Sequence, residues 1–247
     1  GVTKRAGFLR PDGTLPRAGG PINLVIAPHE FYELTESSDA ERHAAALCSV
    51  PVCTEQPGTK WFEMTALLVE ASPMVLDINQ HGVDALAERG ITAQHLRLGG
   101  VPSMDRRETS ERDIDVLFMG GLTDHRAEVL AGLGPHLWNH RSDLRLFDFS
   151  SPVRGDVGDL VFGDDKYDLL ARADILVNVH RDRTDGGYFE WARMVEAMAN
   201  GCTVVTEPST ASSPLVAGEH FIETTEIAET VTELLDDPMR CRSIGER

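Results

Sequence analysis

The amino-acid sequence predicts an α/β protein with two Rossmann-like, doubly wound parallel sheets that face a cleft, the N-terminal half being short or truncated. Three observations support this fold class. Short apolar runs rich in β-branched residues alternate along the 247 residues with segments of helical spacing, and parallel sheets need such crossover helices. A stretch of glycine, proline and charged residues at 99–112 interrupts the alternation. The segment 173–207 then joins a strand, a glycine-bearing loop, a helix and a second strand.

The first half is predicted to be a domain of residues 1–107. Residues 1–20 carry glycine, proline and arginine without periodicity, which indicates an extended arm or the remnant of a longer N-terminal region. After this arm, the patterns predict strands at 22–27, 74–78 and 95–98, and helices at 39–47, 61–70 and 79–89. The linker follows, where glycine and proline replace the apolar period.

The second half is predicted to be a domain of residues 108–247. Its predicted strands are 114–119, 144–149, 175–179 and 202–205, and its predicted helices include 124–133, 167–172, 224–235 and one that begins at Pro238. A further helix follows the glycine-bearing loop and ends at Asn200 and Gly201, which form a suitable C-cap pair. Ligands of doubly wound folds bind at the carboxyl ends of the strands, so the cleft is expected there.

The glycine-bearing loop has the features of a phosphate cradle. It ends in Gly186 and Gly187 before a helix, and the amides and positive dipole end of a helix start can hold a diphosphate without a metal ion. Glu190, Arg193 and Glu196 follow at spacings of three and therefore share one helical face. The alternative interpretation is that these three residues are solvated charges that pair along a surface helix.

Composition excludes several classes of function. A formal charge of −17 without a basic stripe argues against nucleic-acid binding, and it requires that any anionic ligand be held by local amides and arginines. Neither a Gly-x-Gly-x-x-Gly run after a strand nor a P-loop is present, which excludes the usual nicotinamide and P-loop sites. No apolar run approaches the length of a membrane span. The 4 cysteines lack metal or Cys-x-x-Cys spacing, so we expect reduced thiols and a cytoplasmic protein.

Four stretches of the second half resemble, in order and spacing, the nucleotide-binding half of GT-B glycosyltransferases: DVLFMGGLTDHRAEVLAGL, VFGDDKYDLLARADILVNVH, FEWARMVEAMANGCTVVTE and PLVAGEHF. They cover most of residues 114–240 and are most similar to bacterial members that act in polysaccharide and glycoconjugate synthesis. The first half, with TEQPGTKWF and VLDINQHGVDALAERGITAQHLRLGGVP, is more loosely similar to the later part of the acceptor-side domain of that family. The resemblance implies a hexosyltransferase-like enzyme that needs no metal or other cofactor. Its donor would be a nucleotide diphosphate sugar, and its acceptor a small molecule, a lipid-linked molecule or a glycan.

The resemblance also implies which residues bind the donor. Gly120 and Gly121 would allow a tight turn beside the diphosphate, Arg126 would contact a phosphate, and Glu196 would accept hydrogen bonds from the ribose hydroxyls. Tyr188 stands where many retaining members carry an acidic residue, so the stereochemical outcome is unassigned. The remaining donor-site candidates are the nucleobase-bordering Val161, Phe162 and Gly163, the strand-end His180, and the loop residues Gly186 and Gly187.

Catalysis would first require stabilisation of the departing diphosphate. Arg126, Arg193 and the amides near Gly187 are the available positive groups. An inverting reaction also needs a base, and His29 and Glu30 stand where the first predicted strand ends. Glu190 is a further catalytic candidate, placed two residues after the position of the acidic residue in retaining members.

Two other functions stay open at the level of the sequence. One is a nucleotide-sugar epimerase of similar fold, which would need acid and base groups on both sides of the sugar. The other is a catalytically silent nucleotide-binding or scaffold protein, which the short first half suggests.

Overall fold

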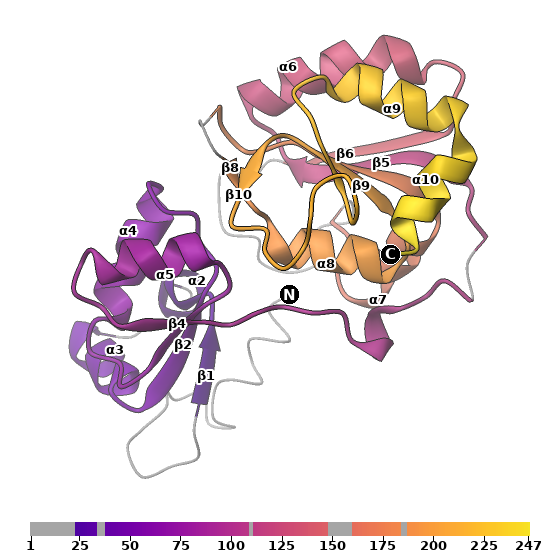
Figure 1. Cartoon of the computed structure of the whole chain (residues 1–247). Coiled ribbons are helices and arrows are strands. Elements are labelled where there is room, and N and C mark those ends of the chain that lie inside the picture. The colour runs from indigo at the N-terminus through magenta and orange to yellow at the C-terminus, as the bar shows by residue number, and fades with distance from the viewer. Residues whose placement is uncertain (1–22, 34–37, 109–110, 148–159, 184–186) are drawn as a thin grey trace. The chain divides into compact units, whose positions relative to one another are not determined.

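The computed structural model describes residues 23–33, 38–108, 111–147, 160–183 and 187–247. The chain forms two compact units, Gly1–Leu98 and Gly99–Arg247 (Figure 1). The division falls before the predicted boundary at residue 107, because linker residues bond to the second unit. The backbone N–H of Arg106 donates to the Asn200 side chain, and Arg112 donates to the Asn200 carbonyl.

The first unit is built on a four-stranded parallel sheet in the order β1-β2-β3-β4. Its core consists of strand residues packed against helix residues. The helix residues Phe62 and Leu86 are fully buried there. The strands are β1 (Asn23–Ile26), β2 (Ser49–Cys53), β3 (Val75–Asp77) and β4 (Ala93–His95), and the helices are α2 (Pro28–Glu33), α3 (Asp39–Ala46), α4 (Lys60–Val69) and α5 (Gln80–Ala87).

The starts of three helices in the first unit follow from short polar side chains. Ser38 and Glu41 form a reciprocal capping box at α3, Thr59 accepts from the backbone of Phe62 at α4, and Asn79 caps α5. β2 was not predicted, since Pro51 interrupts its apolar run and lacks an N–H for the ladder. The strand still forms because β2 pairs with β3 only through Val52 and Cys53, beyond the proline.

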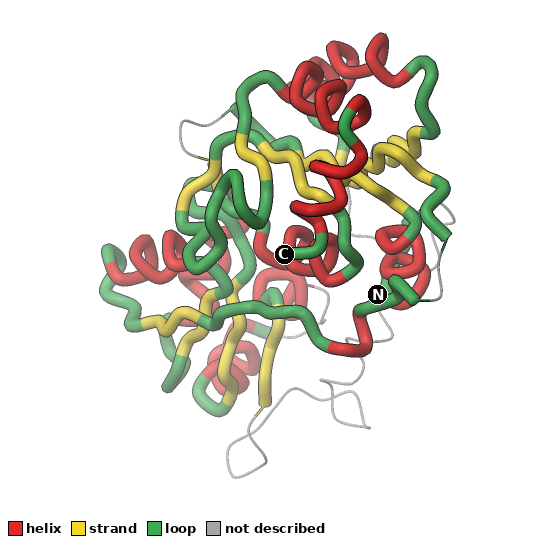
Figure 2. The backbone as a smooth tube through the Cα atoms, turned by 45° about the vertical axis from the view of Figure 1, so that its right-hand side comes forward, coloured by secondary structure: helices red, strands yellow, loops and turns green. Residues whose placement is uncertain are grey.

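The second unit contains a five-stranded parallel sheet in the order β11-β9-β7-β5-β6 and a small two-stranded sheet of β8 and β10. Helices cover both faces of the larger sheet, α6 and α9 on one side and α7 and α8 on the other (Figures 1 and 2). The elements are β5 (Ile114–Gly121), α6 (Asp124–Leu133), β6 (Ser142–Phe147), α7 (Asp164–Ala171), β7 (Ala173–Asn178), β8 (Gly187–Tyr188), α8 (Trp191–Ala199), β9 (Thr203–Thr206), β10 (Ser209–Thr210), β11 (Ile222–Glu223), α9 (Ile227–Asp236) and α10 (Pro238–Gly245), with short 3₁₀ turns at η1 (Pro102–Met104) and η2 (Gly134–Leu137).

The core of the second unit explains the near-continuous apolar runs of its strands. Val116, Phe118, Ile175 and Val177 are fully buried on the face covered by α6, α9 and α10. The intervening Leu117 is also fully buried, since helices pack against the other face as well. The predicted doubly wound α/β fold is thereby confirmed. In the described residues, no helix is both long and apolar enough to cross a membrane.

Candidate active site

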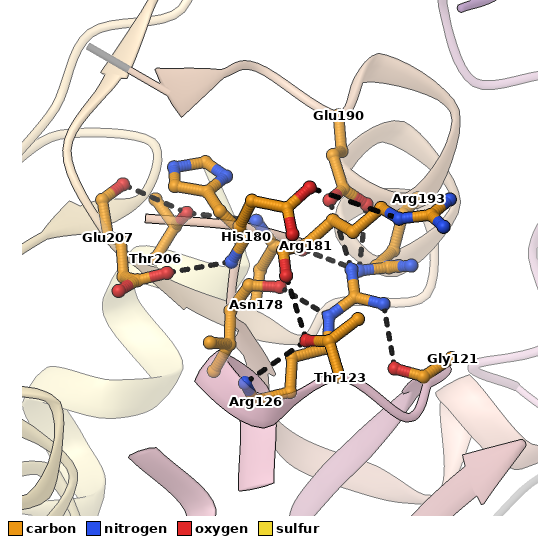
Figure 3. Close-up of polar contacts among 12 residues, drawn as sticks. Gly121, Thr123, Arg126, Asn178, His180, Arg181, Glu190, Arg193, Thr206 and Glu207 are labelled. Carbon is orange, nitrogen blue, oxygen red and sulfur yellow. Dashed lines mark hydrogen bonds and ion pairs between the residues drawn. The ribbon is translucent and has the colours of Figure 1, made fainter. Parts of the chain in front are cut away.

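The candidate site of the second unit lies at the carboxyl ends of neighbouring parallel strands. β5 ends at Gly121, β7 at Asn178 and β9 at Thr206. The chain runs from β5 to β6 on one side and returns to β7 on the other side of β5, so the strand order reverses between β5 and β7. Doubly wound sheets bind ligands in the crevice at such a reversal. Figure 3 shows the polar side chains that gather there.

Arg126 joins the two strands at this reversal. It lies in the first turn of α6, which Thr123 caps by accepting from the Arg126 backbone N–H. Its Nε donates to the Val179 carbonyl and its Nη1 to the Gly121 carbonyl, each at 3.0 Å. Burial, and secondly the repulsion of Arg193, lower the pKa of Arg126 to about 10, so the guanidinium stays charged at neutral pH.

Gly120 provides the space that this guanidinium needs. A Cβ at Gly120 would lie 3.1 Å from Nη1 of Arg126 and 3.0 Å from the ring of Phe118. The glycine pair at the end of β5 therefore does two things: Gly120 admits the arginine and Gly121 accepts its hydrogen bond. Contact between either glycine and a diphosphate stays a prediction.

A second arginine reaches the same place from α8. Nη1 of Arg193 donates to Oδ1 of Asn178 at 2.7 Å and lies 2.7 Å from Oε2 of Glu190. The other carboxylate oxygen, Oε1 of Glu190, accepts from Nη2 of Arg126 at 3.4 Å. One carboxylate is thus shared by two guanidiniums (Figure 3). The structure brings together three residues that were singled out from the sequence, Arg126, Glu190 and Arg193.

His180 is buried under backbone rather than open to a ligand. Its backbone N–H donates to Oε2 of Glu207 at 2.7 Å, and its Nε2 lies 3.0 Å from the Pro208 carbonyl. Because a carbonyl oxygen only accepts, Nε2 carries a proton in this arrangement. A Cβ at Gly187 would lie 2.2 Å from Nε2, so only glycine fits against the ring. His180 is 6% exposed, and its contact with a donor sugar stays a prediction.

The glycine-bearing loop does not lead straight into α8, contrary to the sequence prediction. Gly186 lies outside the described residues. Gly187 and the buried Tyr188 form β8, which pairs in parallel with β10. This pairing keeps the backbone extended, so α8 begins only after Glu190. The helix start therefore lies beside the carboxylate of Glu190 instead of beside the glycines.

Glu196 contacts a different neighbour from Arg193, although both lie on α8. Its two carboxylate oxygens are each 2.7 Å from Nζ of Lys166, on α7. Val161, Phe162 and Gly163 immediately precede α7, where Phe162 is 50% exposed and Gly163 is the N-cap residue with φ 59°. A ribose at Glu196 would have to share this carboxylate with the lysine. The predicted ribose and nucleobase contacts stay predictions.

His29 and Glu30 belong to the first unit and begin α2 instead of a loop. His29 is 4% exposed, with Nδ1 3.3 Å from the Thr65 hydroxyl and Nε2 3.3 Å from Oε1 of Glu55. Both ring nitrogens thus have protein partners, whereas Glu30 is exposed. A catalytic base among these two residues stays a prediction.

The structure adds site residues that the sequence analysis missed. Asn178 orients Arg193, Lys166 neutralises Glu196, and Glu207 connects the His180 backbone to Nε2 of His125 at 2.8 Å. Asn178 is the last residue but one of the predicted strand 175–179, and Glu207 lies two residues beyond the predicted strand 202–205. Polarity near a strand end was the available signal. Within the described part of the chain, no group of three or more His, Cys, Asp or Glu side chains is placed to hold a metal ion.

Comparison with known proteins assigns the family. A family model described as glycosyl transferase-like matches residues 120–247, which contain α6, α8 and all the site residues of the second unit just described. The chain belongs to the glycosyl transferase-like family. No curated protein matches the chain.

Solved structures of GT-B glycosyltransferases share the fold of this chain. HepE from Anabaena, crystallised with UDP and glucose, superposes with a TM-score of 0.51 at 14% identity, over 84% of this chain and 69% of HepE. TarM from S. aureus gives 0.58 at 10% identity, over 91% of this chain but only 49% of TarM. WaaG, a glycosyltransferase involved in lipopolysaccharide biosynthesis, gives 0.50 at 12% identity, over 80% of this chain and 68% of WaaG. At these identities the likeness establishes the fold.

Proposed function

We propose that this glycosyl transferase-like protein moves a sugar from a nucleotide diphosphate donor to an acceptor hydroxyl without a required metal ion. One observation carries the proposal: Arg126 bridges the carboxyl ends of β5 and β7, where the strand order reverses, and Arg193 lies beside it. That is the place at which a doubly wound sheet binds its ligand. Two guanidiniums there offer the bidentate donors that phosphate groups require.

The chemistry follows from the charge that develops as the sugar leaves. Negative charge then grows on the departing diphosphate, and preorganised cations stabilise it without reorganisation during the reaction. Arg126 is held in place by two backbone carbonyls, and Arg193 by Asn178. The start of α8 adds the positive end of a helix dipole. These groups supply positive charge that a metal ion provides in other transferases.

The UDP in the HepE structure suggests a nucleoside diphosphate as the first ligand to test. Calorimetric titration with UDP, GDP, ADP and TDP, with and without EDTA, is expected to show binding of at least one diphosphate that EDTA leaves unchanged. A panel of nucleotide sugars assayed for transfer, hydrolysis and epimerisation would follow. Epimerised donor would favour the epimerase alternative, and binding without turnover would favour a silent protein. The acceptor, proposed to be a small molecule, a lipid-linked molecule or a glycan, and the cytoplasmic location stay predictions.

Replacement of Arg193 is expected to slow turnover more than it weakens donor binding. In Arg193→Ala, the Arg126 guanidinium still holds the ground-state diphosphate, but one of the two cations that face developing charge is gone. The loss of such a donor typically lowers kcat by about 100- to 1000-fold. Steady-state kinetics with donor varied would measure kcat and KM separately. A rise in KM at unchanged kcat would make Arg193 a ground-state anchor only.

Replacement of Glu196 by glutamine is expected to weaken nucleoside diphosphate binding by about 1–3 kcal/mol, because the two ribose hydroxyls would lose one of the two charged carboxylate oxygens that accept from them. Glu196→Gln should leave the affinity for inorganic pyrophosphate unchanged, since pyrophosphate has no ribose. Lys166→Met is the variant matched to Glu196→Gln, because it removes the ammonium partner of Glu196 and keeps the Glu196 carboxylate itself. Equal affinity of wild type and Glu196→Gln for the nucleoside diphosphate would remove Glu196 from the ribose site.

A further inference from the structure

Glu190 holds the two arginines of the candidate site together. Its Oε1 lies 3.4 Å from Nη2 of Arg126 and its Oε2 2.7 Å from Nη1 of Arg193. The side chains are 7% (Arg126), 22% (Glu190) and 24% (Arg193) exposed, so solvent screens this group only partly. Two guanidiniums this close repel each other, and the repulsion contributes to the lowered pKa of Arg126. The shared carboxylate offsets that repulsion.

The hydrogen-bond arrangement leaves guanidinium donors available for a second anion. Arg126 is fixed by the carbonyls of Val179 and Gly121. Arg193 uses only Nη1, for Asn178 and Glu190, and within the described part of the chain nothing accepts from its Nε or Nη2. The formal charges of Arg126, Arg193 and Glu190 sum to one net positive charge. This small positive site lies in a chain of formal charge −17.

The position of Glu190 on its helix is equally informative. Glu190 is the N-cap residue of α8, where an acidic side chain ordinarily accepts from the amides of the first turn. Here the side chain makes no capping hydrogen bond, and its carboxylate is directed to the arginines instead (Figure 3). The carboxylate therefore occupies the space in front of two guanidiniums at a helix start, which is where a bound phosphate group would be stabilised most.

We propose that Glu190 is an exchangeable counter-ion, a positioning residue whose place the donor diphosphate takes. This inference rests on the proposed function. Without donor, Glu190 keeps the two arginines aligned and partly neutralised. The diphosphate carries more negative charge than one carboxylate and can use the open Nε and Nη2 edge of Arg193, so it displaces Glu190. When the sugar has been transferred, the return of Glu190 to the arginines promotes release of the nucleoside diphosphate.

Exchange has a consequence that a purely structural ion pair lacks. Removal of a structural partner weakens the site, whereas removal of a competing anion strengthens binding of the incoming one. Glu190→Gln keeps the size and the hydrogen-bonding oxygen of the side chain but removes its charge. We expect inorganic pyrophosphate and the product nucleoside diphosphate to bind about tenfold or more tightly to this variant, the scale of a close charge pair. In turnover, KM for donor and kcat should fall together, because product release becomes slower.

The experiment is isothermal titration of wild type, Glu190→Gln and Glu233→Gln with pyrophosphate and with the nucleoside diphosphate that wild type binds. Glu233 also pairs with an arginine, Arg240, but on α9 and α10 away from the site, so its variant controls for the change in net charge. Thermal unfolding of each variant identifies any loss of the fold. Tighter binding in Glu190→Gln alone supports the exchange.

Three results would overturn it in distinguishable ways. Unchanged or weaker binding of both anions by folded Glu190→Gln, with wild type still binding the nucleoside diphosphate, refutes the exchange and leaves the proposed function standing. Absence of anion binding by wild type and by both variants refutes the proposed function and the exchange with it. Tighter binding in Glu233→Gln as well would make the effect one of overall charge and also refute the exchange.

Discussion

Arg126→Ala is expected to lower the free energy of unfolding of the second unit by about 3–5 kcal/mol, the range for breaking a buried charge pair by removing one partner. The substitution removes one donor from each of three groups: the carbonyls of Gly121 and Val179, and the carboxylate of Glu190, which keeps only Arg193. It also removes the contact between the ends of β5 and β7. Donor binding should be lost in the same variant, since Arg126 is one of the two cations proposed to hold the diphosphate.

The matched control is Arg141→Ala, because Arg141 also pairs with a carboxylate of the second unit but does so in solvent. Its side chain is 60% exposed, and it contacts Asp115. Exposed pairs of this kind contribute about 0–1 kcal/mol. Urea unfolding can be followed by tryptophan fluorescence in a background in which Trp61 of the first unit is replaced by phenylalanine. The signal then comes from the second unit, where Trp191 on α8 is buried and Trp138 is exposed. Equal losses of unfolding free energy in the two variants would show that Arg126 does not stabilise the fold by connecting β5 and β7.

Arg126→Lys separates the two roles of the residue. Lysine keeps the charge, but its single ammonium lacks the planar fork that serves two carbonyls and a carboxylate at once. We expect part of the stability to return while turnover stays low. Full recovery of turnover in this variant would mean that charge alone, without the fork, is sufficient at the site.

The sequence was informative where periodicity and strand ends decide the structure. The segment 173–207 contains β7, α8 and β9, as its apolar pattern indicates, because the strands are buried on both faces and the helix on one. Arg126 was predicted to contact a phosphate from the resemblance to GT-B glycosyltransferases, and it lies in the first turn of the helix that follows β5. The hydrogen bonds from its guanidinium to two backbone carbonyls were not predicted, because the positions of both carbonyls depend on how β5 and β7 pair.

Long-range partners account for most of what the sequence left unpredicted. Lys166 meets Glu196 only because α7 and α8 pack on the same face of the sheet, and no local pattern connects residues 30 apart. β8 depends on its pairing with β10, which two-residue segments do not reveal. The equal spacing of Glu190, Arg193 and Glu196 suggested one shared face. The helix nevertheless presents Glu196 to α7 and Arg193 to β7, because the long side chains reach in different directions.

A large pH effect on stability is expected in the first unit, at Asp77. This residue ends β3, is 0% exposed, and accepts from the Asn79 backbone through Oδ1 at 2.8 Å. Among the described residues, its buried Oδ2 has no hydrogen-bond partner. Gly82 packs so closely that a Cβ there would lie 2.3 Å from Oδ2. Burial raises the pKa of Asp77 to about 7, against the opposing effect of the Asn79 hydrogen bond.

The sign of the effect follows from proton uptake. Between about pH 4 and pH 7 the folded protein keeps a proton on Asp77 that the unfolded chain releases, so folding is favoured by protonation. The contribution to stability is fully present below pH 4 and is lost as the pH rises to 7 and above. A difference of about three pKa units corresponds to roughly 4 kcal/mol. Asp77→Asn, which imitates the neutral acid, should therefore exceed wild type in stability at pH 8 by up to that amount.

The measurement is urea unfolding of wild type, Asp77→Asn and Asp39→Asn at pH 5 and pH 8. Asp39 lies on α3 of the same unit with a fully solvated side chain, so its variant controls for loss of an acidic group. Only the difference between Asp77→Asn and wild type should grow with pH, because other carboxylates titrate alike in both proteins. A difference that stays constant between pH 5 and pH 8 would mean that Asp77 is ionised throughout. Its buried Oδ2 would then require a donor that only a bound molecule or a rearranged α5 could provide.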